Sequence, residues 1–186
     1  MQHYAGQYYH VYNRGVNRQP IFANEENHHF LLRRVKQFLP LYQIRIVAYS
    51  LMPNHYHLLF GVDKEGSLSP FLQRLFNSYS QAFNRQQNRT GTLFEGRAKS
   101  ILVNESNCVY ALVRYIHLNP VVAGLVANPE DWCFSNFLEW IDGRNDELFD
   151  PHFRELFFSS SHEYKNFVLC DIPDALERKL AKYYLD

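Results

Sequence analysis

The sequence predicts an α+β sandwich in which helices cover a four-stranded sheet. Short segments rich in β-branched and aromatic residues indicate strands, and longer segments whose apolar residues recur every three or four positions indicate helices. Along the chain they follow in the order strand, helix, strand, strand, helix, strand, helix. The first six match the ferredoxin-like βαββαβ unit, so we expect this sandwich with an additional catalytic helix and a C-terminal, mostly helical extension.

The first two predicted elements of the sandwich are a strand and a helix. Residues 8–15 (YYHVYNRG) alternate and are rich in Tyr and Val, which predicts a strand that ends at Gly15. Asn24 is a suitable N-cap for the helix that follows, because Glu25 comes directly after it and apolar residues then recur at helical spacing. We expect this helix to stop at Pro40.

A hairpin with an unusual motif comes next. The apolar runs IRIVAYSLM (44–52) and HYHLLFGV (55–62) are joined by a Pro-Asn pair, which predicts two adjacent antiparallel strands. Side chains alternate between the faces of a strand, so His55 and His57 point to one face while Tyr56 points to the other. The hairpin therefore aims two nitrogen donors at the same spot.

The second half of the predicted sandwich begins with a helix and ends with a strand. Ser69 and Pro70 are expected to be the N-cap and the first residue of the helix, whose apolar residues continue at helical spacing. Gly91 breaks this pattern. Residues 92–103 then predict a fourth strand, interrupted at Gly96.

The last helix of the sandwich and the C-terminal extension complete the chain. Asn104 is expected to cap this helix and Pro120 to end it. We predict a catalytic domain over residues 1–128 and an acidic extension over 129–186 that packs on it. The extension carries Trp132 and several other aromatic residues, so we expect it to fold back as short helices.

Charge is distributed unevenly along a chain whose net charge is zero. Residues 1–120 hold 13 Lys and Arg against 6 Asp and Glu, a net charge of +7, and residues 121–186 hold 6 against 13, a net charge of −7. A basic front half favours a polyanionic partner such as nucleic acid.

Composition also narrows the class of protein. The 186 residues suit one domain with an appendage, and 46% of them are hydrophobic. No stretch approaches the roughly 18 apolar residues of a membrane span, and the first residues lack the pattern of a secretory signal. The three cysteines are odd in number and far apart, so we expect reduced thiols. These features predict a cytoplasmic protein with no membrane partner.

The helix expected after Asn104 offers partners for the two histidines. Tyr115 and Asn119 are four residues apart and share one helical face. If that face lies across the sheet from His55 and His57, two imidazoles, one amide oxygen and open positions could bind Mg²⁺ or Mn²⁺. A phenol beside such a metal site on a basic face indicates covalent nucleophilic attack on a phosphodiester.

These motifs resemble a known family. MPNHYHLL together with RYIHLNPVVAGLV, preceded by NSYSQAFNRQQNRTGTLFEGRAKS, resembles the IS200-like single-tyrosine (Y1) transposases, most closely those associated with bacterial repetitive extragenic palindromes. The resemblance spans about residues 8–140. It implies a histidine-hydrophobic-histidine (HUH) motif at His55 and His57, the nucleophile at Tyr115, and a third metal ligand at Asn119, where insertion-sequence members often have Gln.

The resemblance also implies an activity and a partner. Family members cleave and rejoin single-stranded DNA near a hairpin through a 5′-phosphotyrosine, with Mg²⁺ or Mn²⁺. They act as dimers or as monomers, and both states are open for this chain. We expect DNA contacts from basic and polar side chains in two clusters: Arg85, Arg89, Arg97 and Lys99 around the fourth strand, and Asn13, Arg14 and Arg18 at the end of the first.

Two other functions are compatible with the same residues. The chain could be a non-catalytic nucleic-acid-binding protein derived from this fold. It could also be a metal-dependent nuclease in which water attacks, leaving no covalent intermediate. Among 13 tyrosines, Tyr79 and Tyr110 are the alternatives to Tyr115 as nucleophile.

Overall fold

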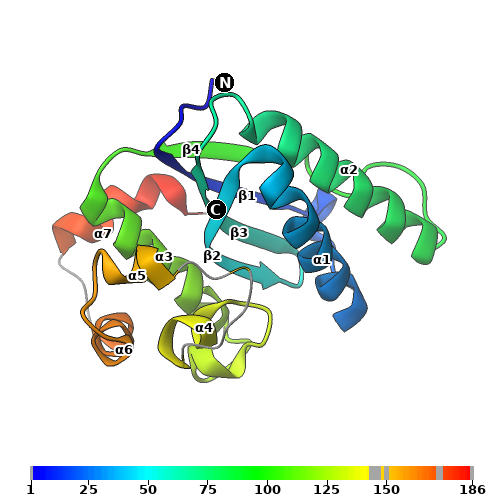
Figure 1. Cartoon of the computed structure of the whole chain (residues 1–186). Helices are drawn as coiled ribbons and strands as arrows, with labels where there is room; N and C mark the ends of the chain where they lie inside the picture. The colour runs from blue at the N-terminus through cyan, green and yellow to red at the C-terminus, as the bar shows by residue number, and fades with distance from the viewer. Residues whose placement is uncertain (1, 143–147, 149–150, 171–173, 185–186) are drawn as a thin grey trace.

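The structure, a computed structural model, has the predicted α+β sandwich fold and describes residues 2–142, 148, 151–170 and 174–184. The sandwich consists of β1 (Gln7–Arg14), α1 (Glu25–Tyr42), β2 (Ile44–Met52), β3 (His55–Val62), α2 (Leu68–Gln86), β4 (Lys99–Val103) and α3 (Ser106–Val122) (Figure 1). The extension contains α4 (Phe137–Asp142), α5 (Pro151–Glu155), α6 (Ser161–Leu169) and α7 (Asp174–Leu180). Short 3-10 turns lie at η1 (Val16–Arg18), η2 (Pro129–Asp131) and η3 (Ala181–Tyr183).

The sheet has the order β2-β3-β1-β4, and each neighbouring pair is antiparallel. Because β3 lies between β1 and β2, the first three strands form the split βαβ arrangement of the ferredoxin-like unit. The central position of β3 gives it a partner on both sides. His57 is opposite Tyr12 of β1 and Ser50 of β2.

Each face of the sheet has its own hydrophobic core. Helices α1 and α2 cover one face, where Tyr56 and Phe60 are fully buried. Helix α3 and the helices of the extension cover the other (Figure 1), and Leu112 and Trp140 are buried there in one cluster. The extension therefore packs against the sheet and α3 as short helices. The division into units of residues 1–128 and 129–186 stays a prediction.

A β-bulge in β2 ties the extension to the sheet. Ile46 and Ala48 face consecutive residues of β3, which leaves Val47 as the extra residue. The carbonyl oxygen of Val47 accepts hydrogen bonds from Asn136 Nδ2 at 3.0 Å and from Trp140 Nε1 at 3.2 Å. Side chains of the extension thus satisfy a buried carbonyl of the bulge.

Two helices end later than the sequence predicts. Helix α1 continues past Pro40 to Tyr42, and α3 continues past Pro120 to Val122. A proline lacks the amide hydrogen and disfavours the helical conformation of the residue before it, yet in both helices the backbone stays helical through the proline and for two further residues. The chain leaves the helical conformation at left-handed residues instead: Gln43 has φ 52° after α1, and Gly124 has φ 69° after α3.

The fourth strand is shorter than predicted. β4 covers Lys99–Val103, and the segment from 92 to 98 is irregular apart from a bridge between Gly15 and Phe94. Gly96, at φ 150°, turns the chain out of the strand direction.

The predicted caps had mixed outcomes. Asn24 accepts a hydrogen bond from the amide of Asn27, as expected of an N-cap. The predictions of Ser69 and Asn104 were wrong, because Ser67 and Glu105 occupy the N-cap positions of α2 and α3. Neither makes a side-chain capping bond, so helix packing fixes these starts.

Neither a membrane-spanning helix nor a disulfide is present in the described part of the chain. No helix there has the length and apolar character needed to cross a bilayer. Cys108 is buried, Cys133 and Cys170 are exposed, and all three are free thiols.

Candidate active site

The site is built on the first residues of β3, directly after the hairpin turn. His55 is half-buried and His57 is completely buried, and their ring centroids are 5.2 Å apart. Strand alternation turns both rings toward α3, while Tyr56 packs against Phe76 of α2 on the opposite face at 4.6 Å between ring centroids.

Helix α3 brings the phenol and the amide to the histidines. Asn119 Oδ1 lies 3.1 Å from His55 Nε2, and the ring of Tyr115 meets the ring of His57 edge-on at 5.2 Å between centroids. The structure therefore brings together the four side chains that sequence periodicity placed on facing surfaces. Tyr79 and Tyr110 do not join them.

The other candidate nucleophiles have different surroundings. Tyr79 is buried between α2 and the loop after β1, where its hydroxyl donates to the carbonyl of Ile21 at 2.5 Å, and burial raises its pKa. Tyr110 packs against Phe157 and Phe167 of the extension. Neither phenol faces the histidine pair.

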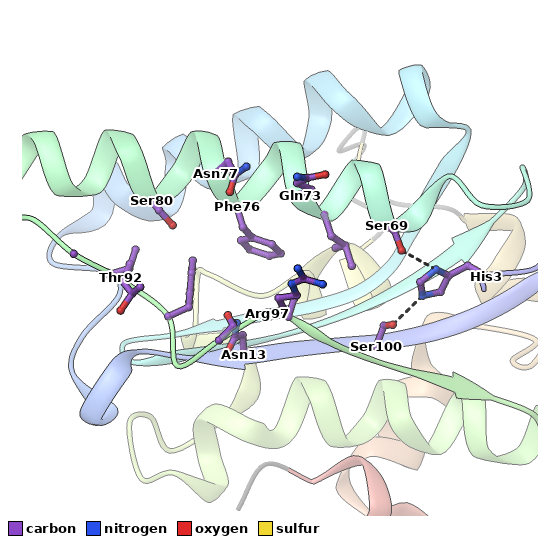
Figure 2. A pocket seen from close by; sticks show the side chains of 16 residues that line it. His3, Asn13, Ser69, Gln73, Phe76, Asn77, Ser80, Thr92, Arg97 and Ser100 are labelled. Carbon is purple, nitrogen blue, oxygen red and sulfur yellow. Dashed lines mark hydrogen bonds between the residues drawn. The ribbon is translucent and has the colours of Figure 1, made fainter. Parts of the chain in front are cut away.

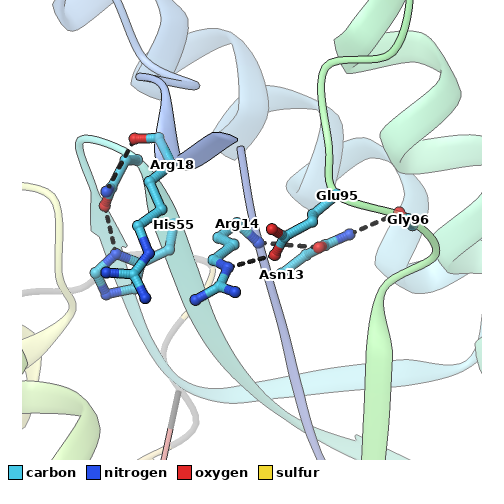
Figure 3. A network of polar contacts seen from close by, with 7 residues as sticks. Asn13, Arg14, Arg18, His55, Glu95 and Gly96 are labelled. Atoms are coloured by element: carbon cyan, nitrogen blue, oxygen red, sulfur yellow. Dashed lines mark hydrogen bonds and ion pairs between the residues drawn. The ribbon is translucent and has the colours of Figure 1, made fainter. Parts of the chain in front are cut away.

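Hydrogen bonding fixes which nitrogen of His55 carries its proton. Asn54 Nδ2 donates to the carbonyl of Arg18 at 3.2 Å, so Asn54 Oδ1 is the acceptor that faces His55 Nδ1 at 2.7 Å (Figure 3). In the neutral ring Nδ1 therefore carries the hydrogen, and the lone pair of Nε2 faces the amide oxygen of Asn119. Two acceptors at 3.1 Å repel each other unless a cation lies between them or the Asn119 amide is turned to donate.

His57 has a nitrogen that lacks a partner. Its Nδ1 lies 3.1 Å from His10 Nε2, whereas its Nε2 is buried and has no hydrogen-bond partner among the described residues. Burial, together with the nearby His10 and His55, lowers the pKa of His57 well below its usual value. Burial also lowers the pKa of His55, and Arg14 adds to this effect. Both rings are therefore neutral at pH 7, the form that binds metals.

The donor set fits a divalent metal ion. It consists of the Nε2 atoms of His55 and His57 and the Oδ1 atom of Asn119, and it leaves positions for water and phosphate oxygen. Within the described ranges no three His, Cys, Asp and Glu side chains cluster as a metal site, so the set depends on the amide oxygen. The unpartnered Nε2 of His57 and the facing acceptors at His55 support this fit.

Two further aromatic residues that sequence reasoning missed border the site. Tyr184, from the end of the extension, stacks on Tyr115 with 4.4 Å between ring centroids, and its hydroxyl donates to Glu177 Oε1 at 2.6 Å. Tyr12 lies beside His57 at 6.1 Å between centroids. The alternation of strand residues 8–15 contains a signal for Tyr12, and no local pattern indicates Tyr184.

The predicted cluster of Asn13, Arg14 and Arg18 is divided between the two faces of the sheet (Figure 3). Arg14 lies opposite His55 in the β1–β3 pairing and forms an ion pair with Glu95. Arg18 is exposed, next in space to the hairpin turn. Asn13, one residue before Arg14, points to the other face, where its Nδ2 donates to the carbonyl of Gly96 at 2.9 Å.

Asn13 and Arg97 line a groove on the face of the sheet opposite Tyr115. The groove has a volume of about 780 Å³ and lies between α2 and the segment that leads into β4. Figure 2 shows Gln73 and Asn77 projecting from α2, with Asn13 and Arg97 across from them. Its lining combines these polar side chains with apolar ones and contains no Asp or Glu, so the groove suits a ligand that has both apolar and polar or anionic parts.

The other predicted DNA contacts do not all lie at this groove. Arg85 is exposed in the last turn of α2. Arg89 lies over the ring of Phe83, and its Nη2 donates to the carbonyl of Thr92 at 3.1 Å. Lys99 is exposed at the start of β4 over the ring of Tyr12, which places it on the active-site face.

Comparison with known proteins identifies the family. Residues 3–119 match the family model described as "Transposase IS200 like". This span is more than half of the chain and contains both histidines, Tyr115 and Asn119. The chain therefore belongs to the IS200-like transposase family, as its motifs predicted. No curated protein matches it.

Solved structures share the fold. The structure of a REP-associated tyrosine transposase bound to a REP hairpin has a TM-score of 0.60 and 19% sequence identity, covering 81% of this chain and 86% of that chain. A proposed transposase from Deinococcus radiodurans R1 has a TM-score of 0.44 and 17% identity, covering 62% of this chain and 92% of that chain. At sequence identities this low, structural similarity is evidence for the fold and not for the activity. Of the two structures, we base the fold comparison on the first.

Proposed function

We propose that this protein cleaves and rejoins single-stranded DNA at hairpin or palindromic repeat elements, through a 5′-phosphotyrosine formed on Tyr115 and with Mg²⁺ or Mn²⁺. The observation that carries the proposal is the meeting of Tyr115 with His55, His57 and Asn119 in a member of the IS200-like transposase family. The related structure that shares the fold is of a transposase bound to a REP hairpin, which supports hairpin DNA as the partner.

Tyr115 is the nucleophile in this proposal. Its hydroxyl oxygen attacks the phosphorus of a phosphodiester and forms the new O–P bond, while the bond from phosphorus to the 3′ oxygen breaks. The phenolic proton passes to water, and the departing 3′ oxygen takes a proton to become a hydroxyl. The products are a 5′-phosphotyrosine and a free 3′ hydroxyl.

His55, His57 and Asn119 would hold the metal ion. A divalent ion at this place supplies positive charge that offsets the negative charge developing on the phosphate oxygens. The histidines contribute neutral rings, because burial lowers both pKa values. The amide would contribute an oxygen without adding negative charge, which would leave the positive charge of the ion available to phosphate.

The covalent intermediate explains how the strand can be rejoined. A phosphotyrosine conserves the energy of the phosphodiester, so a 3′ hydroxyl can attack it and restore the DNA backbone without a nucleotide cofactor. Water attack would instead release a 5′-phosphate permanently.

The groove between α2 and β4 is the second part of the proposed DNA-binding surface. Amide and hydroxyl side chains and Arg97 line it beside apolar side chains such as Phe76, and no carboxylate does. Such a groove suits an unpaired stretch of DNA, whose bases need polar partners and whose phosphates need positive charge. Arg89, whose Nη2 donates to the carbonyl of the groove-lining Thr92, adds positive charge beside it.

A labelled hairpin oligonucleotide tests the chemistry. The oligonucleotide carries an unpaired flank and is incubated with the protein and Mn²⁺ or Mg²⁺, and the products are separated on a denaturing gel. We expect a labelled protein band that Tyr115→Phe abolishes and that the control Tyr110→Phe, on the same helix, retains. Cleavage without this band would favour the water-using nuclease, and binding without cleavage the non-catalytic protein.

The salt dependence of hairpin binding tests the groove. If about five phosphates are contacted, the logarithm of the binding constant should fall against the logarithm of salt concentration with a slope of about −3.5. Arg97→Glu should weaken binding and make the slope shallower by roughly one phosphate contact, about 0.7. Arg33→Glu, a charge reversal on the exposed surface of α1, is the matched control. If Arg97→Glu binds the hairpin with wild-type affinity, the groove is not part of the DNA-binding surface.

A further inference from the structure

His10, a residue of β1 that has no place in the proposed chemistry, contacts one of the proposed metal ligands. It is completely buried, and its Nε2 lies 3.1 Å from His57 Nδ1. The two rings are within 8° of parallel, with centroids 5.2 Å apart. Strand alternation places His10 on the same face as Tyr12, which stacks on it at 5.1 Å.

Two imidazole nitrogens at 3.1 Å share a single hydrogen, and its position decides what His57 can do. If His10 Nε2 carries the hydrogen, His57 Nδ1 is the acceptor, and the neutral His57 ring must then carry its own hydrogen on Nε2. That ring cannot bind a metal ion through Nε2. If His57 Nδ1 carries the hydrogen, Nε2 has a free lone pair that faces the site.

We propose that His10 is a positioning residue, which accepts the Nδ1–H of His57 and holds this ring in the tautomer and orientation that present Nε2 to a divalent cation. The inference rests on the proposed function only in taking His57 as a cation ligand. Ligating histidines commonly donate their other ring nitrogen to a second residue, which fixes the ring and increases its basicity. Here that second residue is another histidine.

The unfavourable environment of His10 supports a functional role. In the proposed tautomer its hydrogen is on Nδ1, and this atom is buried with no hydrogen-bond partner among the described residues. Around the ring lie Tyr12, His57 and, edge-on at 6.0 Å, Tyr183. Phe at this position would remove the buried unpaired donor but would leave His57 Nδ1 without a partner, so the contact with His57 is what histidine provides here.

Titration of the metal-free protein with Mn²⁺, followed by electron paramagnetic resonance in the absence of DNA, tests this role without any measurement of activity. His10→Phe should bind Mn²⁺ about 10- to 100-fold more weakly than wild type, the usual effect of losing such a partner. It should unfold at a similar temperature, because one unpaired buried nitrogen, on His10, is exchanged for another, on His57. His10→Gln, whose amide oxygen can accept the Nδ1–H, should recover much of the affinity.

Two controls separate the possible failures. His57→Ala should abolish binding, and His28→Phe, which replaces a buried histidine between Phe22 and Phe134, should leave it unchanged. Loss of binding in His57→Ala but wild-type affinity in His10→Phe would overturn the role of His10 and keep the metal site. Absence of Mn²⁺ binding in the wild type would refute the metal site, and the inference with it.

Nitrogen NMR of the imidazole rings in the metal-free protein gives a readout that is independent of the metal. The expected signal pattern for His57 is that of a neutral ring protonated on Nδ1. His10→Phe should mix this tautomer with the Nε2-protonated one. A wild-type His57 ring protonated mainly on Nε2 would overturn the inference.

Discussion

Asn136→Ala is the sharpest test of how the extension holds helix α3, which carries Tyr115 and Asn119. Asn136 is fully buried, and its Oδ1 accepts from the backbone amide of Tyr49 at 2.8 Å and from His117 Nε2 at 2.9 Å. Its Nδ2 donates to the carbonyl of Val47 at 3.0 Å. One amide thus joins the bulged strand β2 to α3 at a residue that lies between Tyr115 and Asn119.

The expected loss of stability follows from the groups that the substitution leaves without partners. The amide of Tyr49 and Nε2–H of His117 lose their acceptor, whereas the carbonyl of Val47 keeps the indole of Trp140. A buried polar group without a partner costs about 1–3 kcal/mol, so two of them cost about 2–6 kcal/mol. This is a large fraction of the roughly 5–15 kcal/mol that stabilises a typical domain.

Equilibrium unfolding in urea measures this loss. With a slope of about 2 kcal/mol per M, a loss of about 3 kcal/mol moves the midpoint down by about 1.5 M. Asn166→Ala, at an exposed position of α6, should change the stability by less than about 0.5 kcal/mol. An Asn136→Ala midpoint within about 0.5 M of the wild type at an unchanged slope would refute the reasoning.

Three further predictions concern the pH dependence of stability, an ion pair and a glycine. Burial lowers the pKa of His10 to about 3 and that of His117 to about 4, below the unfolded value near 6.5. The unfolded chain therefore binds protons first, and stability that is complete above about pH 6.5 should fall by about 2 kcal/mol per histidine at pH 5. A urea midpoint that is equal at pH 7 and pH 5 would contradict this. Glu95→Gln removes the carboxylate that pairs with Arg14, so hairpin affinity should rise and its salt slope should steepen, as fluorescence anisotropy can measure. Gly15→Ala places a Cβ atom 2.1 Å from the carbonyl oxygen of Gln19 and should destabilise the protein by about 1–3 kcal/mol, which thermal unfolding would detect.

Local sequence patterns predicted the hairpin, and they predicted which of the site residues share one face of a strand or of a helix. The two strands 44–52 and 55–62 have the predicted bounds, because their composition and the Pro-Asn turn agree. His55 and His57 share a face through the period of a strand, and Tyr115 and Asn119 through the period of a helix. From the sequence, we had to assume only that the helix face with Tyr115 and Asn119 packs against the sheet face with His55 and His57. The βαββαβ order of the elements favours this packing.

What the sequence could not predict depends on register and on long-range packing. The contact between His10 and His57 requires the pairing of β1 with β3, which no local pattern specifies. The stacking of Tyr184 on Tyr115 requires the path of the whole extension. The rule that proline ends a helix failed at Pro40 and Pro120, because each helix continues for two more residues and ends where a later residue, Gln43 or Gly124, takes the left-handed conformation.

The end of β1 joins the two surfaces proposed to bind DNA. Because side chains alternate along the strand, Asn13 lines the groove on the α2 face while the next residue, Arg14, lies opposite His55 on the active-site face. Gly15 then donates its amide to the carbonyl of Asn54 at 2.8 Å, which fixes the hairpin turn directly before His55. A strand bound in the groove therefore needs to pass only this end of the sheet to reach the histidines, so the groove and the phenol can act on neighbouring parts of one DNA molecule although the sheet separates them.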